Sequence, residues 1–231
     1  MLKPVMLQRW HEISFFHWSC EPEVLQRRLP PGLELDRFDG KAWISLTPFL
    51  LIGLRPPLLP RTLGFDFPEM NLRTYVVGPQ GPGIWFFSLD AARLFAVVGA
   101  WATYGLPYFS ARMAVDIGET QNFYSSRRAD GAKATIRISK ESRITEQSPL
   151  DVFLTARSRL YSTYARRLIT AQVAHPPWEL NRVGILEFEE TVRRAMGVEF
   201  PSDQFLAHHS PGVDTKIGPP RPCLSHWQRV S

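Results

Sequence analysis

Short glycine turns that separate alternating apolar and polar runs limit most strongly how this chain can fold. Asp39-Gly40 and Asp130-Gly131 are each typical of a tight hairpin turn, because both residue types tolerate positive φ angles. A longer glycine-proline loop, residues 78–83, separates another pair of runs. The paired runs are residues 33–38 and 41–47, residues 71–77 and 84–89, and residues 123–124 and 134–139. This period-two alternation predicts three β-hairpins and hence an antiparallel sheet.

Helix signals are fewer and are spread along the chain. Ser148-Pro149 with Asp151 is typical of a capped helix start, and Gly105 followed by Pro107 is a strong helix stop. The predicted helices are residues 22–29, 91–104, 149–156 and 189–196. Scattered helices beside three hairpins predict an α+β protein rather than a doubly wound one.

The remaining segments divide into strands and loops. Residues 53–68 hold four prolines, which are too many for the interior of a sheet, so this segment is predicted to be a rim loop or lid. Residues 108–117 and the runs around Leu160 and residues 168–173 are predicted strands. The tail from Pro211 is predicted to be loop.

Length and composition indicate one domain over residues 1–231. The lack of a signal peptide predicts that this domain lies in the cytoplasm. No apolar run approaches the ~18 residues that span a bilayer, and the first residues lack the apolar core of a signal peptide, so no membrane partner is predicted. Cys20 and Cys223 lie near opposite ends and form neither a disulfide framework nor a zinc motif.

The net charge of +5 raises the question of nucleic-acid binding. The basic residues occur as scattered doublets among acids, such as Arg127-Arg128 and Arg193-Arg194, and form no continuous stripe. Solvated faces explain this pattern, so no nucleic-acid partner is predicted. A homo-oligomer is compatible with the sequence, which does not specify the oligomeric state.

Seven motifs, in order along the chain, carry a family resemblance. They are Phe38–Phe49, Asn71–Val76, Ile84–Ala91, Leu106–Met113, Phe153–Tyr161, His175–Leu180 and His208–Val213. Together they resemble the YqjF-like family (DUF2071), a family of unknown function in the acetoacetate decarboxylase-like superfamily. The resemblance covers nearly the whole chain, and it implies a mainly antiparallel β-barrel or cone with several flanking helices around an interior pocket.

The superfamily's founding enzyme forms a Schiff base through a lysine that follows a Gly-x-Pro turn. Here Gly105-Leu106-Pro107 matches that turn, but Tyr108-Phe109 stand where the lysine pair is expected. A phenol with a reference pKa of ~10 cannot form an iminium with a ketone. The chain is therefore predicted not to be a Schiff-base decarboxylase, and whether it is an enzyme at all stays open.

The candidate ligand site lies on one face of a predicted strand. Alternation places Asn71, Arg73 and Tyr75 together, and Arg73 would grip a carboxylate while Trp85 and Phe87 pack against the rest of the ligand. Under the structural alternative, Arg73 pairs with Glu69 or another acid on a solvated face and Tyr75 only packs.

Glu69 and Tyr108 are the candidate acid/base residues, and Tyr108 is also a candidate ligand contact from the Gly-x-Pro turn. The alternative for Tyr108 is a core tyrosine with a satisfied hydroxyl. Arg157 is predicted to form a structural ion pair, and His17 to be a hydrogen-bonded core histidine. His208 and His209 would point to opposite sides of a strand, so they form no chelate, and no metal or cofactor is predicted.

Three hypotheses on function follow. The leading one is a small-molecule-binding protein that holds an organic, anionic ligand in an internal pocket. The second is a lyase or hydratase that acts on a keto or enol acid without Schiff-base chemistry. The third is a structural or partner-binding protein whose Asn71, Arg73 and Tyr75 face is covered by another subunit.

Overall fold

The computed structural model describes residues 2–93, 104–200 and 204–223, and in these ranges the chain forms thirteen strands of one sheet. They are β1 Met6–Cys20, β2 Glu34–Leu35, β3 Ala42–Arg55, β4 Phe65–Gly78, β5 Gly81–Ala91, β6 Tyr108–Ile117, β7 Gln121–Arg128, β8 Lys133–Arg143, β9 Arg159–Tyr164, β10 Arg167–Ala174, β11 Asn181–Glu190, β12 Leu206–Ile217 and β13 Arg221–Pro222. Neighbouring strands are antiparallel except where β5 pairs with β6 and with β9.

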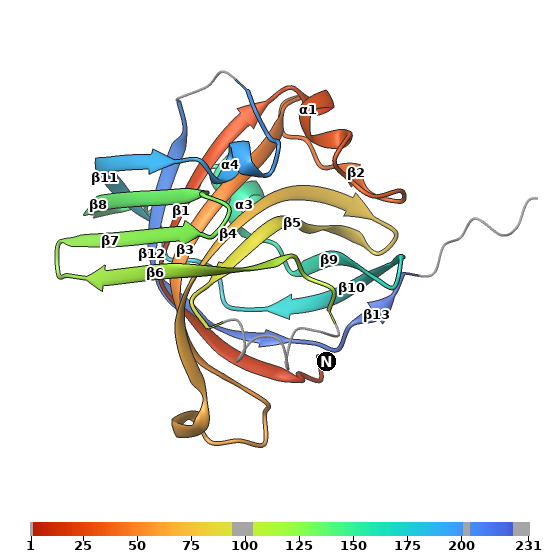
Figure 1. Cartoon of the computed structure of the whole chain (residues 1–231), viewed down its shortest axis with the longest axis horizontal. Helices are drawn as coiled ribbons and strands as arrows, with labels where there is room; N and C mark the ends of the chain where they lie inside the picture. The colour runs from red at the N-terminus through yellow and green to blue at the C-terminus, as the bar shows by residue number, and fades with distance from the viewer. Residues whose placement is uncertain (1, 94–103, 201–203, 224–231) are drawn as a thin grey trace, which may run out of the picture.

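The sheet closes on itself twice. Nine strands form a closed barrel in the order β5, β6, β7, β8, β11, β12, β1, β3 and β4, which returns to β5. A smaller ring branches from it, because β9 pairs with β5 and β10 pairs with β12. Figure 1 shows β6, β7 and β8 on one side of the molecule and β9 and β10 on the other. Strands β12, β1, β3, β4 and β5 therefore belong to both rings.

Each face of the shared strands packs against a different apolar core. The small-ring core joins Phe15, Tyr75 and Phe86 to Leu160 and Val173, which come from β9 and β10. The large-ring core joins residues of the opposite face to β7 and β8, and it includes Phe16, Leu72, Phe87, Tyr124 and Ile136. Where both faces are covered, a polar side chain on the shared strands is buried whichever way it points, although Asp214 and Lys216 near the end of β12 are exposed.

Few helices accompany the sheet in the described ranges. They are α1 Pro22–Gln26, the single-turn 3₁₀ helix η1 Arg61–Leu63, α3 Pro149–Thr155 and α4 Val192–Ala195. The Ser148 signal is confirmed at α3, where Ser148 and Asp151 form a reciprocal capping box. None of these helices is long and apolar enough to cross a membrane. Most of the predicted helix at 91–104 lies outside the described residues.

The α+β prediction with a mainly antiparallel barrel is confirmed, as are the hairpins β4–β5 and β7–β8. The predicted hairpin at Asp39-Gly40 is wrong in its pairing. The turn exists, with Phe38 and Lys41 bridged across it, but β2 pairs with β4. Both edges of β3 are already occupied, by β1 and by β4, so β3 cannot accept β2.

Three other boundaries are corrected. The loop predicted at 53–68 is shorter, since β3 continues to Arg55 and β4 begins at Phe65. The helix predicted at 189–196 shrinks to α4, because β11 stays paired with β8 through Glu190. The tail from Pro211 is not loop but continues β12. Gly212 adopts a φ of 105° there, and a side chain at that position would lie 1.9 Å from the Trp10 carbonyl oxygen.

Candidate functional site

One face of β4 carries the polar residues that the sequence singles out. Glu69, Asn71, Arg73 and Tyr75 alternate along the strand, and their side chains turn toward the same side as the small-ring core. Their exposed fractions are 4%, 7%, 6% and 0%. The solvated face of the structural alternative is therefore ruled out, and each of these polar groups needs a buried partner.

Arg73 has no carboxylate partner among the described residues. Its Nε and Nη2 atoms lie buried without a hydrogen bond, and no carboxylate lies within ion-pair distance of it, Glu69 included. The guanidinium carbon lies 5.6 Å from the centre of the Phe15 ring. Burial lowers the pKa of Arg73, and the neighbouring Tyr75 opposes this, but a guanidinium remains charged in proteins. The site thus holds an uncompensated positive charge.

Glu69 and Tyr108 do come together. The Tyr108 hydroxyl donates to Glu69 Oε2 over 3.3 Å, and Tyr108 reaches this point because β6 starts beside Leu89 of β5. Burial raises the pKa of Glu69 to about 8, although hydrogen bonds from Asn71 and Tyr108 oppose the rise. Burial also raises the pKa of Tyr108 well above its usual value. Near neutral pH Glu69 therefore carries a proton and can act as an acid.

Trp85 and Phe87 lie elsewhere than the alternation predicts. A register shift between Leu72 and Arg73 leaves Phe87 as the extra residue of a bulge, so Phe86 comes opposite Arg73. Phe86 packs in the small-ring core, whereas Phe87 belongs to the large-ring core and Trp85 packs against it. The bulge shifts the phase of β5, and nothing in the alternation of the sequence reveals it.

His17 and Ser45 are site residues that sequence reasoning did not place beside Arg73. The register sets His17 of β1 opposite Ser45 of β3, and Ser45 opposite Arg73 of β4. His17 Nδ1 lies 2.6 Å from Ser45 Oγ, which lies 2.6 Å from the Tyr75 hydroxyl. The prediction of a hydrogen-bonded core histidine is confirmed for Nδ1, but His17 Nε2 is buried without a partner within the described ranges.

His208 joins the same face from β12, while His209 does not. His208 Nε2 lies 3.1 Å from Asp151 Oδ1 at the start of α3, and the centre of its ring lies 5.6 Å from that of His17. Its Nδ1 atom is also buried and has no hydrogen-bond partner in the part of the chain that the structure describes. Arg157, as predicted, forms an ion pair, with Asp36 at 2.5 Å. No group of three metal-binding side chains occurs among the described residues.

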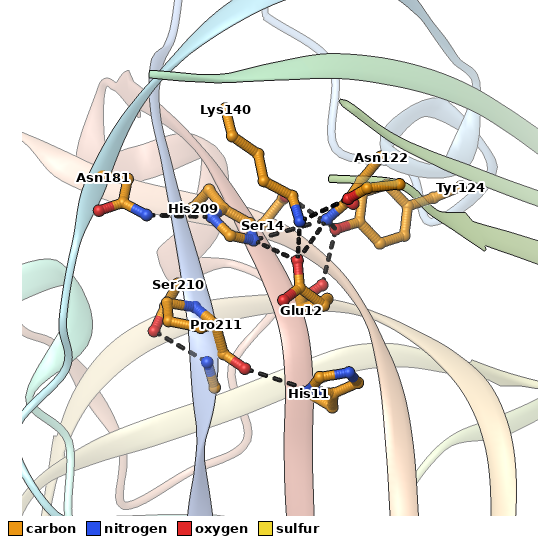
Figure 2. A network of polar contacts seen from close by, with 12 residues as sticks. His11, Glu12, Ser14, Asn122, Tyr124, Lys140, Asn181, His209, Ser210 and Pro211 are labelled. Carbon is orange, nitrogen blue, oxygen red and sulfur yellow. Dashed lines mark hydrogen bonds and ion pairs between the residues drawn. The ribbon is translucent and has the colours of Figure 1, made fainter. Parts of the chain in front are cut away.

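A second polar network surrounds Glu12, as Figure 2 shows. The Oε2 atom of Glu12 lies 2.7 Å from Lys140 Nζ and 2.9 Å from both His209 Nε2 and Asn122 Nδ2. Glu12 sits at a bulge of β1 with a φ of 49°, and Tyr124 donates to its carbonyl oxygen. These contacts join β1, β7, β8 and β12, so the network stabilises the barrel at this point.

Arg73 does not line any of three surface pockets of the protein. Three pockets of about 730, 430 and 250 Å³ are lined by other residues, and the smallest includes Trp85 and Phe87. The case for a site on β4 therefore depends on its buried, unpaired polar atoms. They are Arg73 Nε and Nη2, Asn71 Oδ1, His17 Nε2 and His208 Nδ1.

Glu69 and Glu12 should shift stability with pH in opposite directions. The folded-state pKa of Glu69 is raised from 4.5 to about 8, so the free energy of unfolding should fall as pH rises between these values, by at most about 1.4 kcal/mol per unit. The pKa of Glu12 is lowered, against the effect of burial, by His209, Asn122 and Lys140. Its contribution should be present above pH 4.5 and lost as the pH falls below it.

Urea unfolding of Glu69→Gln and Glu12→Gln over this pH range tests both statements. Glu69→Gln should remove the decline toward high pH, and Glu12→Gln should be less stable than the wild type at neutral pH, with the difference shrinking in acid. Parallel pH profiles for Glu69→Gln and the wild type would contradict the buried, protonated state of Glu69.

Relatives of the chain agree with this architecture. Residues 7–214 match DUF2071, an uncharacterized conserved protein family. The uncharacterized protein YqjF of Bacillus subtilis (strain 168) is 38% identical over 222 residues, which cover 94% of this chain and 92% of YqjF.

Solved structures share the fold at low sequence identity. The enduracididine biosynthesis enzyme MppR, complexed with pyruvate, has a TM-score of 0.70 at 14% identity and covers 96% of this chain and 92% of its own. Acetoacetate decarboxylase from Legionella pneumophila has a TM-score of 0.65 at 13% identity, and the match covers 96% of this chain and 87% of the decarboxylase chain. This chain therefore belongs to the DUF2071 family of uncharacterized proteins, and its fold is that of the acetoacetate decarboxylase-like enzymes.

Proposed function

We propose that this protein binds a small organic anion, most simply a carboxylate, through Arg73. The observation that carries the proposal is a guanidinium only 6% exposed with no carboxylate within ion-pair distance among the described residues. An unpaired buried charge costs several kcal/mol. This cost is of the same order as the whole free energy of unfolding of a typical protein, so a compensating group is expected. A ligand carboxylate matches the planar fork of the guanidinium and would supply that compensation.

The surroundings of Arg73 suit a ligand with a short carbon skeleton. Phe15 lies beside the guanidinium and Phe86 lies opposite it on β5, so apolar surface adjoins the charge. MppR, which shares the fold, has been solved with pyruvate bound, and pyruvate is a small carboxylate. This likeness supports the class of ligand but not its identity.

A partner subunit is a weaker explanation of the same residues. Asn71, Arg73 and Tyr75 are already buried by the chain itself, with exposed fractions of 7% or less. A second subunit could cover only residues that reach the surface. The cytoplasmic location, the single domain and the absence of nucleic-acid and metal partners stay predictions.

A catalytic role is favoured by one further observation. Glu69 is protonated near neutral pH and lies on the same strand face as Arg73, with Tyr108 hydrogen-bonded to it. An acid held next to a bound enolate can protonate its carbon, while Arg73 stabilises the negative charge. The second candidate function is thus a lyase or hydratase on a keto or enol acid, with Glu69 as proton donor.

None of the five lysines, all of which lie among the described residues, is placed for imine chemistry. Lys41, Lys133 and Lys140 form ion pairs with Glu21, Glu189 and Glu12. Lys3 and Lys216 are exposed. A nucleophilic lysine needs a lowered pKa in a desolvated pocket, and burial of this kind surrounds Tyr108 instead. This supports a role other than Schiff-base decarboxylation.

Arg73→Met tests the binding function. The variant should lose the rise in melting temperature that acetate, pyruvate or 3-hydroxybutyrate gives the wild type, because the carboxylate loses its partner. Without ligand it should be as stable as the wild type or more so, since an unpaired buried charge is removed. Arg193→Met is the matched control. It breaks an ion pair with Glu190 and should lower stability while leaving the ligand response intact. A ligand response that persists in Arg73→Met would exclude Arg73 from the site.

Glu69→Gln tests the catalytic candidate. The assay follows the ultraviolet absorbance of enol-oxaloacetate as it converts to the keto form; Glu69 gives its proton to the carbon, and the enol hydroxyl releases one to solvent. The wild type should accelerate this conversion, less so above about pH 8 where Glu69 is ionised, and Glu69→Gln should not. Equal rates for the two proteins would eliminate Glu69 as the acid.

Borohydride trapping tests the absence of imine chemistry. Incubation with acetoacetate and borohydride, followed by mass spectrometry, should leave the mass of the chain unchanged, because each lysine is either exposed or held in an ion pair. A stable adduct on any of the five lysines would contradict this expectation.

A further inference from the structure

Two imidazole nitrogens near Arg73 have no partner among the described residues. They are Nε2 of His17 and Nδ1 of His208, which lie on rings whose centres are 5.6 Å apart. His17 is 0% exposed and His208 is 7% exposed, so bulk water does not solvate either nitrogen. What each nitrogen requires depends on whether it carries a proton.

A chain of hydrogen bonds determines the protonation of His17. The Tyr75 hydroxyl donates its single proton to the Leu154 carbonyl oxygen, at 2.7 Å. Tyr75 must therefore accept from Ser45, whose only proton is then used, and Ser45 must accept from His17 Nδ1. In neutral His17 the proton is on Nδ1, so Nε2 is left with a lone pair.

Asp151 determines the protonation of His208. Its Oδ2 atom accepts from the backbone nitrogen of Ser148 and its Oδ1 atom faces His208 Nε2. An ionised carboxylate only accepts, so His208 Nε2 carries the proton and Nδ1 has the lone pair. Burial lowers the pKa of both histidines, although Asp151 opposes this for His208, and the lowered pKa keeps both rings neutral near pH 7.

The buried polar groups beside Arg73 therefore require two kinds of ligand group. The guanidinium needs an anionic acceptor, while the two imidazoles offer lone pairs and need a hydrogen-bond donor. His17, Ser45 and Arg73 occupy adjacent positions across β1, β3 and β4, so the cation and the lone pairs are about two strand spacings apart at the backbone. A single small molecule can meet both needs if it carries a donor group as well as a carboxylate.

We propose that the ligand is a hydroxy acid, or the enol form of a keto acid, whose carboxylate pairs with Arg73 and whose hydroxyl donates to His17 Nε2 or His208 Nδ1. This inference rests on the proposed function and narrows its ligand class. A keto acid in its carbonyl form turns an acceptor toward the lone pairs and leaves them unpaired. Sites built around a substrate hydroxyl discriminate strongly against analogues that lack it, because the buried polar groups are then unsatisfied.

Calorimetric titration with matched ligand pairs tests the proposal. The wild type should bind 3-hydroxybutyrate at least about tenfold more tightly than acetoacetate, and lactate more tightly than pyruvate, at a pH near 7.5. Both enantiomers of each hydroxy acid are titrated, since only one can direct its hydroxyl toward the histidines. Equal affinities within both pairs, or tighter binding of the keto acids, would overturn the inference, and an ordered water molecule would then be the partner of the imidazoles.

Variants separate this proposal from the one on which it rests. At least one of His17→Phe and His208→Phe should lose the preference for the hydroxy acids and keep its affinity for acetoacetate. His11→Phe is the control, because His11 is a part-buried histidine of β1 that contacts Pro211, and this variant should keep the preference. Arg73→Met should weaken all four ligands. If Arg73→Met binds normally while the wild type still prefers hydroxy acids, the proposed function fails and the donor requirement survives. Failure of every ligand to bind the wild type overturns both.

Nitrogen-15 spectra of the histidine side chains give a test that needs no variant. The wild type should show His208 protonated on Nε2 and His17 on Nδ1, and binding of 3-hydroxybutyrate should shift one of the unprotonated nitrogens. Protonation of the opposite nitrogen in both rings would overturn the inference, because both imidazoles would then be donors.

Discussion

Five strands of this sheet belong to two closed rings at once, and that constraint governs the rest of the molecule. Strands β12, β1, β3, β4 and β5 are covered by a separate apolar core on each face. Where both faces are covered, a polar side chain cannot turn to solvent, so it needs a partner inside the protein or in a bound ligand. On the large-ring side Arg128 is paired with Asp90 and is held by Ser88. On the small-ring side no carboxylate of the described residues pairs with Arg73 in this way.

The contrast between these two arginines indicates that the β4 face is a candidate ligand site. Both guanidinium groups are almost fully buried, with exposed fractions of 3% for Arg128 and 6% for Arg73. A stable barrel requires only the arrangement seen at Arg128, in which the carboxylate of Asp90 and the hydroxyl of Ser88 satisfy the charge. The second arrangement costs stability, and unsatisfied buried groups of this type are concentrated at sites where a ligand completes the structure.

Local patterns in the sequence predicted those parts of the site that a single unbroken strand determines. The alternation of Asn71, Arg73 and Tyr75 is regular, and the structure retains it. Trp85 and Phe87 follow an equally regular pattern, but the bulge at Phe87 reverses the facing of the residues before it. The relation of His17 to Ser45 and Arg73 depends on register across three strands, and that of His208 to Asp151 depends on where α3 packs. A single sequence contains no local signal for either. The same limit explains why the prediction of a loop from Pro211 is wrong, since Pro211 and Gly212 resemble turn residues locally.

The pairing of β1 with β12 closes both rings, and it joins residues such as Met6 and Ile217 from opposite ends of the chain. Neither ring can close until β12 has been synthesised, which gives the fold a high contact order and predicts slow folding. While β1 waits for β12, one of its long edges and the apolar faces of β3 and β4 are open to other chains. During that interval the unpaired strands can aggregate with other chains, and a chaperone that covers nascent strands would protect the protein most at this stage.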